Sequence, residues 1–165
     1  MTTHYFGMRG EELRIERATP ADAARVWELQ RAAFEEYVGI QNPPPSAWRA
    51  SVTDVEQWLR HGGGLLAWLG DSLAGSIVWS YRGPVFYVQH VAVHPGLRRR
   101  GIATRMMTWL EAEALREGYA HLALRIRSAL KTNQALYESL GFVTTDTAPH
   151  PLGGAETLTR MEKHL

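Results

Sequence analysis

The fold is decided by the stretch V-A-V-H-P-G-L-R-R-R-G-I-A at residues 91–103. An apolar run typical of a buried strand leads into a glycine-bearing turn, and the turn opens a helix. A helix start offers unpaired backbone N–H groups and the positive end of the helix dipole, and Gly101 lets an anion approach the backbone closely. Arginines 98–100 add positive charge, and no acidic residue occurs between positions 95 and 111. The turn is therefore suited to a phosphate or pyrophosphate, with an ordinary helix start and solvated arginines as the alternative.

Strands and helices alternate on both sides of this stretch. Thr19-Pro20 predicts a helix start, because threonine caps the N-terminus and proline fits the first helical position. Alternation through one continuous core predicts a single α/β domain at residues 13–165 behind a loose N-terminal leader at 1–12. The expected strands are residues 13–17, 65–69, 73–80, 85–93 and 122–126 with two more near the C-terminus, and the expected helices follow Thr19 and lie at about 53–60, 102–117 and 132–140.

Composition narrows the class of protein. The 165 residues are 45% hydrophobic and 21% charged, which is typical of a globular domain. The 18 Lys+Arg against 17 Asp+Glu leave a net charge of +1, which gives no support for a nucleic-acid or membrane partner. The absence of cysteine excludes a disulfide framework and a thiolate nucleophile, and the histidines show no ligand spacing, so no metal is expected. Without an apolar run or a signal segment, the expected location is cytoplasmic.

Two glycine patterns are similar to nucleotide-binding loops, but the residues around each of them argue against such a loop. Gly96 and Gly101 have P-loop spacing, but Ile102-Ala103 replaces the Lys-Ser/Thr pair that contacts phosphate and magnesium. Gly62-Gly63-Gly64 precedes a strand, whereas a dinucleotide-binding loop must follow one. We interpret the second pattern as a turn.

A second informative segment is N-Q-A-L-Y-E-S-L-G-F at residues 133–142. Asn133 and Tyr137 are four residues apart and therefore share one face of the predicted helix. A tyrosine held beside a reacting group can donate a proton. The alternative is a tyrosine that is half-buried for packing.

Together the two segments resemble the GNAT superfamily of N-acetyltransferases. Residues 98–103 match its acetyl-CoA signature, [Q/R]-x-x-G-x-[G/A], and residues 136–142 look like its second signature. The clear resemblance covers roughly residues 85–145. It implies a single GNAT-like α/β (α+β) domain with a central mixed, mostly antiparallel sheet of about six to seven strands, flanked by about four helices.

The resemblance also implies a cosubstrate, acetyl-CoA, and residues that bind it. Tyr137 corresponds to the family's general acid, which protonates the departing CoA thiolate. Asn133 resembles an asparagine that holds the cofactor, although many members place it where this chain has Leu130. The remaining expected contacts are the main chain of Val91, Ala92 and Val93 for the pantetheine arm, and Arg98, Arg99, Arg100, Gly101, Ile102 and Ala103 for the pyrophosphate.

The general base is less clear from the sequence. Some GNAT enzymes use a glutamate on a central strand, where this chain offers Gln89, His90 and Arg125. His90 has a suitable unperturbed pKa and is the candidate base, against a water-relayed proton or a packing role. Trp48, beside a proline run, either walls an acceptor pocket or pins a surface loop.

These observations predict an acetyl-CoA-dependent N-acetyltransferase. It moves an acetyl group to a primary amine of a small molecule or peptide by direct attack on the thioester. The alternative is a non-catalytic acyl-CoA-binding sensor module. A third hypothesis, that residues 98–100 bind nucleic-acid phosphates, is disfavoured by the near-neutral chain. GNAT enzymes are often dimers, which leaves a homodimer open.

Overall fold

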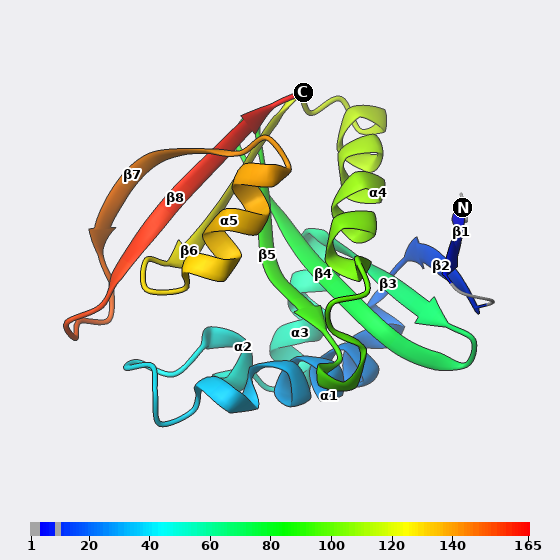
Figure 1. Ribbon diagram of the computed structural model, residues 1–165, viewed down its shortest axis with the longest axis horizontal. Coiled ribbons are helices and arrows are strands. Elements are labelled where there is room, and N and C mark those ends of the chain that lie inside the picture. The colour runs from blue at the N-terminus through cyan, green and yellow to red at the C-terminus, as the bar shows by residue number, and fades with distance from the viewer. Residues whose placement is uncertain (1–3, 9–10) are drawn as a thin grey trace.

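One sheet runs through the whole domain (Figure 1). The computed structural model describes residues 4–8 and 11–165. Its sheet has eight strands in the order β1-β2-β3-β4-β5-β6-β8-β7, and every neighbouring pair is antiparallel except the parallel pair β5–β6. The strands are β1 (His4–Met8), β2 (Glu11–Arg17), β3 (Gly63–Leu69), β4 (Ser72–Arg82), β5 (Val85–Val93), β6 (His121–Arg127), β7 (Val143–Pro149) and β8 (Thr157–His164).

Helices cover both faces of the sheet. One face packs against α1 (Ala23–Phe34) and α3 (Val52–His61) through a cluster that includes Val26, Leu59 and Val78. The other packs against α4 (Ile102–Arg116) and α5 (Lys131–Ser139) in a larger core. A single turn, α2 (Ser46–Arg49), lies between α1 and α3. No helix of the described residues is long and apolar enough to cross a membrane.

The expected single domain with a mostly antiparallel sheet is confirmed, and two details differ. The sheet has eight strands instead of six or seven because residues 4–8, expected within a loose leader, pair with β2 as β1. Residues 1–3 and 9–10 of that expected leader lie outside the described residues. The short α2 follows the proline run and has no periodic signal of its own.

The three consecutive glycines are required by close packing between β3 and β4. A Cβ on Gly62 would lie 2.0 Å from the carbonyl oxygen of Trp79, and one on Gly63 would lie 2.6 Å from the Trp79 ring. No side chain fits at either separation. The run thus ends α3 and admits the buried Trp79, but only Gly62 lies in the expected turn, because Gly63 and Gly64 already belong to β3.

Strands β5 and β6 part within the sheet. Their pairing runs from Val85–His121 to Val88–Leu124 and stops there, although β5 continues to Val93 and β6 to Arg127. A bulge opposite β4 accompanies the parting and places His90 in the left-handed region with φ +50°. The edges of both strands that face the gap therefore have no ladder partner.

Candidate active site

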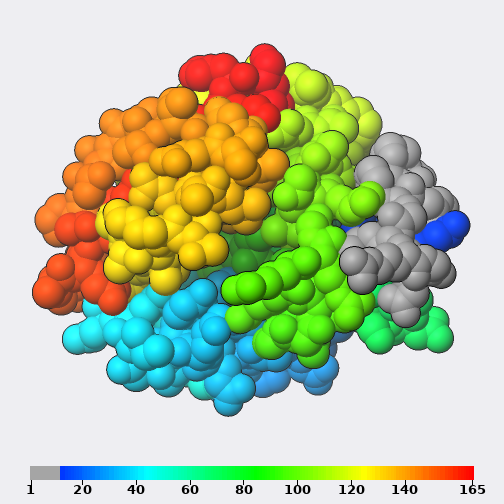
Figure 2. All heavy atoms as spheres, viewed as in Figure 1, coloured from blue at the N-terminus to red at the C-terminus, as the bar shows by residue number. Residues whose placement is uncertain are grey.

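A cavity of about 370 Å³ lies at the parting of β5 and β6. Its walls come from both strands, from α5, from the segment between α1 and α3, and from the loop between β7 and β8. Figure 2 shows the surface hollowed between α5 in yellow, the segment around residues 40–50 in cyan, and the turn after β5 in green. Segments far apart in sequence thus meet around one space.

Tyr137 projects from α5 into this cavity. The residue is 6% exposed and packs edge-on against Phe142, with ring centroids 5.8 Å apart. Burial raises the pKa of Tyr137 above its ordinary value, so the phenol stays protonated near neutral pH. No other residue in the described part of the chain hydrogen-bonds to its hydroxyl, which leaves the proton available to a bound molecule.

Asn133 lines the same cavity one helical turn before Tyr137. Its half-buried amide makes no hydrogen bond within residues 4–8 and 11–165. Leu130, at the start of α5, also lines the cavity but offers only an apolar side chain. The expected pairing of Asn133 with Tyr137 on one helix face is therefore present in the geometry, and the polar group at this end is Asn133.

From Arg98 onward, the turn between β5 and α4 leaves its backbone amides without a backbone acceptor. Arg99 and Gly101 both have positive φ, +62° and +74°, and such turns point successive N–H groups into one concavity. Across the described residues, the N–H groups of 98–104 donate to no other backbone group, and the first such bond of α4 is from Arg105 to Gly101. A Cβ on Gly101 would meet nothing within 4 Å, so the space above the turn is open. Arg99 and Arg100 are exposed beside it.

Arg98 differs from its neighbours in this turn. Its guanidinium donates to the carbonyl of Ala33 at 2.8 Å and forms an ion pair with Glu36 at 2.6 Å. Both partners lie at the end of α1 or just beyond it. The side chain thus ties the turn to α1, and the backbone N–H of Arg98 donates to no other backbone group of the described residues.

Residues 91–93 of β5 lead from the cavity to this turn. Val91 lines the cavity, and Ala92 is buried against Leu29 and Ala33 of α1. Their main chain pairs with β4 on one side, while the side toward β6 has no strand partner. This arrangement leaves a strip of backbone groups between Tyr137 and the turn.

His90 lines the cavity but is a weak base in this environment. Its ring stacks on Trp58 of α3, with centroids 4.6 Å apart and planes 23° apart. Burial lowers the pKa of His90 to about 4, so the imidazole is neutral at pH 7. An ammonium group such as that of lysine has a pKa near 10.4, far above the pKa of His90. Transfer of a proton from it to His90 is therefore strongly unfavourable.

Trp48 does not line the cavity, although its neighbours Ala47 and Arg49 do. The guanidinium of Arg31 lies 3.9 Å from the centroid of the Trp48 ring and donates to its carbonyl at 3.0 Å. Of the two roles considered for Trp48, pinning the loop is the one this geometry fits.

Four cavity-lining arginines were not predicted from the sequence as a group. Arg49, Arg82, Arg125 and Arg127 come from α2, β4 and β6, and His150 joins them from the loop before β8. Only Arg125 stood out, as a residue of a central strand. No local motif connects positions this far apart, so the fold alone brings them together.

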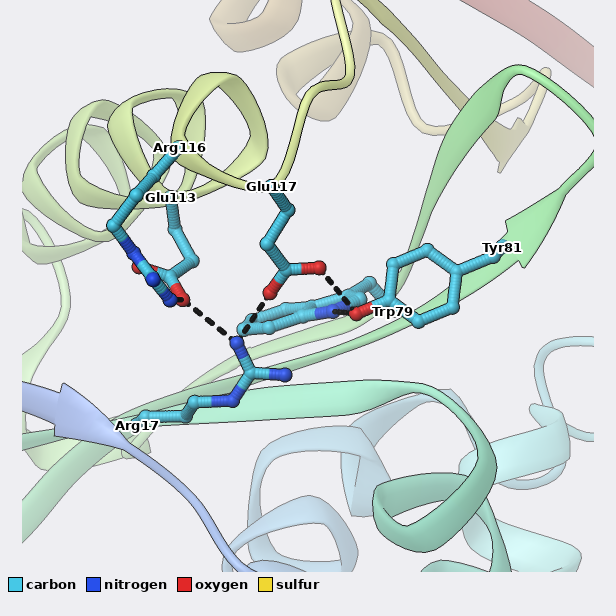
Figure 3. A network of polar contacts seen from close by, with 6 residues as sticks. All are labelled: Arg17, Trp79, Tyr81, Glu113, Arg116 and Glu117. Carbon is cyan, nitrogen blue, oxygen red and sulfur yellow. Dashed lines mark hydrogen bonds and ion pairs between the residues drawn. The ribbon is translucent and has the colours of Figure 1, made fainter. Parts of the chain in front are cut away.

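A different polar cluster lies on the α4 face of the sheet (Figure 3). Arg17 of β2 bonds to Glu113 at 2.7 Å and to Glu117, and its guanidinium lies 5.4 Å from the centroid of the Trp79 ring. The hydroxyl of Tyr81 donates to Glu117 at 2.5 Å. The Arg116 guanidinium holds the pKa of Glu113 below its usual range. Every charge in this cluster has a partner, and the contacts tie α4 to β2 and β4.

Comparison with known proteins identifies relatives of this chain. The family model described as Acetyltransferase (GNAT) family matches residues 24–142. An acetyltransferase of Yersinia enterocolitica is 28% identical over 102 residues, which cover 61% of this chain and 72% of that protein. An acetyltransferase of Pectobacterium atrosepticum is 29% identical over 101 residues, covering 60% and 72% of the two chains.

Solved structures share the fold. The ribosomal-protein-S18-alanine N-acetyltransferase of Escherichia coli has a TM-score of 0.74 at 19% identity, covering 92% of this chain and 93% of that one. A Bacillus subtilis acetyltransferase in complex with CoA has a TM-score of 0.72 at 19% identity, covering 93% and 99%. The family model spans the helices, the turn and the cavity described above, and with it the expected membership is confirmed: this chain belongs to the acetyltransferase (GNAT) family.

Proposed function

We propose that this protein transfers an acetyl group from acetyl-CoA to a primary amine at the cavity between β5 and β6. The observation that carries the proposal is the parting of these strands after Val88 and Leu124, which opens a space lined by Tyr137 and Asn133. A turn with free backbone amides lies at the end of β5, so one extended cosubstrate can reach from the turn to the tyrosine.

The residues present suit acetyl-CoA. The amides of residues 99–103 and the exposed Arg99 and Arg100 would hold the pyrophosphate, because an anion is favoured at a helix N-terminus. The strip of β5 backbone at residues 91–93 would hydrogen-bond the pantetheine arm, and the Asn133 amide would hold it from α5. Bound there, acetyl-CoA supplies an activated acetyl group as a thioester.

Tyr137 is the proposed general acid. The amine nitrogen attacks the carbonyl carbon directly, the carbon–sulfur bond breaks, and the sulfur takes the proton of the Tyr137 hydroxyl. The phenolate then recovers a proton from the acetylated nitrogen. Burial makes a lasting phenolate unfavourable, so we expect the two proton transfers to be closely coupled. The chain has no cysteine, in agreement with a route that has no thiol-bound acyl enzyme.

The acceptor amine is protonated at neutral pH and must lose a proton before it attacks. Water is the proposed acceptor of that proton. With a pKa of about 4, His90 is unsuited to take it directly. Its stacking on Trp58 instead supports a positioning role at the bulge, where the ring holds the backbone of β5 that faces the bound cosubstrate. Among the alternatives weighed for His90, we therefore favour packing with a water-relayed proton.

The experiment that tests this function measures both halves of the reaction. Thermal unfolding of the purified protein should shift upward by about 5–10 °C at 100 times the Kd of acetyl-CoA or CoA, and ATP should have no such effect. Release of the CoA thiol is then followed with a panel of primary amines. Turnover with at least one amine supports the enzyme, whereas binding with no turnover on any amine would favour the sensor alternative.

The acceptor amine, the cytoplasmic location and a homodimer stay predictions.

A further inference from the structure

Four arginines line the wall of the cavity. Arg49, Arg82, Arg125 and Arg127 all contribute to its wall, together with His150. Within the described residues, no aspartate or glutamate lines it. Glu156, which lies beside the cavity and does not line it, pairs with one of these arginines, Arg127.

The arginines differ in how firmly they are already engaged. Arg127 forms an ion pair with Glu156 and donates to the carbonyls of Pro43 and Pro44. The Arg49 Nε donates to the Pro44 carbonyl at 3.1 Å.

The two remaining cations have no carboxylate partner among the residues that the structure describes. The Arg82 guanidinium lies 3.6 Å from the centroid of the Tyr87 ring. The exposed Arg125 side chain has no hydrogen bond or ion pair to any other residue of the described ranges. Arg82 and Arg125 are therefore the cations best placed to bind an anion.

Arg82 is too far from the turn to serve the pyrophosphate, whereas Arg125 follows Leu124, whose partner Val88 lies five residues before Val93. Arg82 pairs with Val85 at the start of β5, and the turn follows Val93 at its end. Eight residues of extended strand at about 3.3 Å each separate the two positions by roughly 26 Å. An anion bound at Arg82 must therefore belong to another part of the reaction, and the acceptor is the remaining reactant.

Two loops that contribute to the cavity wall contact each other. The backbone N–H of Asn42 lies 3.4 Å from a Glu156 oxygen, and a Cβ on Gly154 would lie 2.7 Å from the Asn42 carbonyl oxygen. Arg127 joins both loops through Glu156, Pro43 and Pro44. Residues of both loops also line the cavity, and its volume of about 370 Å³ suits a small acceptor.

The electrostatic effect of the cations is visible on His150. Its pKa is lowered, first by burial and then by the nearby Arg127 and Arg49. Glu156 opposes the shift without cancelling it. The electrostatic potential at the cavity wall is therefore positive near His150, although Glu156 pairs with Arg127 there.

We propose that the acceptor is a small primary amine that also carries an anionic group, a carboxylate or a phosphate, bound by Arg125 and Arg82. The amine nitrogen faces Tyr137, and the anion lies toward the arginines. Guanidinium groups bind such oxyanions through paired, charge-assisted hydrogen bonds. Amines with several positive charges are disfavoured, because like charges would face each other in the cavity. This inference rests on the proposed acetyl transfer and specifies its acceptor.

The experiment uses matched pairs of amines with the purified full chain at saturating acetyl-CoA. The common α-amino acids are compared with their carboxamides, and aminoalkyl phosphates with the corresponding amino alcohols. We expect at least a tenfold higher kcat/KM for the charged member of the preferred pair. The carboxylate and phosphate arms then identify which anion the site takes.

Variants connect the preference to the arginines. Arg125→Gln should raise the KM of the anionic amine about ten- to hundredfold, the usual effect of losing a charged hydrogen bond, and leave kcat within a fewfold. The KM of the uncharged partner should not change. Arg82→Gln should act in the same direction. Arg25→Gln, an exposed arginine of α1 outside the cavity, is the matched control and should leave both amines unaffected.

The outcomes separate this inference from the proposed function. If neutral or polycationic amines are the better substrates, or if no anionic amine is acetylated, the inference is wrong while acetyl transfer itself stands on the other amines. If acetyl-CoA neither stabilises the protein nor is consumed with any amine, the proposed function fails and the inference fails with it. Equal effects of Arg125→Gln on the charged and uncharged amines would also overturn the inference.

Discussion

Two groups of arginines occupy opposite faces of the same sheet and are treated differently by their surroundings. On the α4 face, Arg17 and Arg116 are matched by Glu113, by Glu117 and by the hydroxyl of Tyr81 (Figure 3). On the α1 face, Arg82 and Arg125 line an open cavity with no carboxylate partner among the described residues.

This contrast shows how roles can be assigned to residues of one type. A paired arginine in a half-buried network holds secondary structure together, and removing it leaves a carboxylate uncompensated. An unpaired arginine at a cavity contributes little to folding, because water already solvates it. The first group should therefore affect stability without affecting the reaction, and the second should do the reverse.

The largest expected effect comes from the cavity and concerns rate alone. Tyr137→Phe removes the hydroxyl and keeps the ring that packs on Phe142. Loss of a general acid typically slows a reaction by about 10²–10⁴-fold, and we expect kcat to fall within that range. The Kd of acetyl-CoA and the thermal midpoint should change little.

Tyr119→Phe is the control for that variant. Tyr119 stacks on Tyr81 at 5.2 Å between ring centroids and lies outside the cavity. Its kcat should stay within about twofold of the wild-type value, since the proton transfers of the reaction do not involve this hydroxyl. An unchanged kcat in Tyr137→Phe would remove the tyrosine from the mechanism.

The next effect comes from the paired region and concerns stability alone. Arg17→Met should lower the free energy of unfolding by about 1–3 kcal/mol, because Glu117 loses its cationic partner while Arg17 itself is only partly buried. Arg125→Gln should stay within about 0.5 kcal/mol of wild type. Urea unfolding measures both, and a larger loss for Arg125→Gln than for Arg17→Met would reverse the comparison.

The smallest effect concerns pH and the stacked histidine. His90 has a pKa of about 4 in the folded chain and an ordinary value near 6.5 when unfolded. Between these values the unfolded chain binds the proton and the folded chain does not, so the contribution to stability is present above pH 6.5 and is lost as pH falls toward 4.

The variant His90→Asn removes the titrating imidazole, and asparagine tolerates the positive φ at this position. The pH dependence of its unfolding free energy should therefore be smaller by about 1–2 kcal/mol. Urea midpoints at pH values of about 4.5 and 7 for both proteins measure it, and His150 titrates equally in each. The same variant should keep kcat within about tenfold. A loss beyond about a hundredfold, with a changed pH–rate profile, would restore His90 as the base.

Much of this fold could be predicted from local patterns. The apolar run of residues 85–93 predicts β5 to the residue, and the glycines at 118 and 141 follow α4 and α5 closely. Strand β1 could not be predicted, because its pairing depends on the edge that β2 presents and not on a pattern in residues 4–8.

Part of the candidate site could likewise be predicted from the sequence, and part of it could not. The turn at residues 98–103 and the tyrosine of α5 are carried by contiguous motifs, so the sequence could reveal them. The arginines of the cavity come from α2, β4 and β6, and the parting of β5 and β6 brings them together. The weak basicity of His90 also depends on Trp58, which lies 32 positions earlier in the sequence.

Two glycines at opposite ends of α4 offer a matched pair for testing how the cosubstrate is held. Gly101 and Gly118 both have positive φ, +74° and +89°, and a Cβ on either would meet nothing within 4 Å. Changing each to alanine therefore costs similar backbone strain, about 1 kcal/mol. Only the methyl group at Gly101 would lie in the space above the amides that we propose to hold the pyrophosphate.

The measurement is the rise in thermal midpoint on adding CoA. We predict that Gly118→Ala keeps the wild-type rise and that Gly101→Ala loses most of it at the same CoA concentration. Equal rises in the two variants, or no rise in the wild-type protein, would contradict the assignment of this turn and the acetyl transfer built on it.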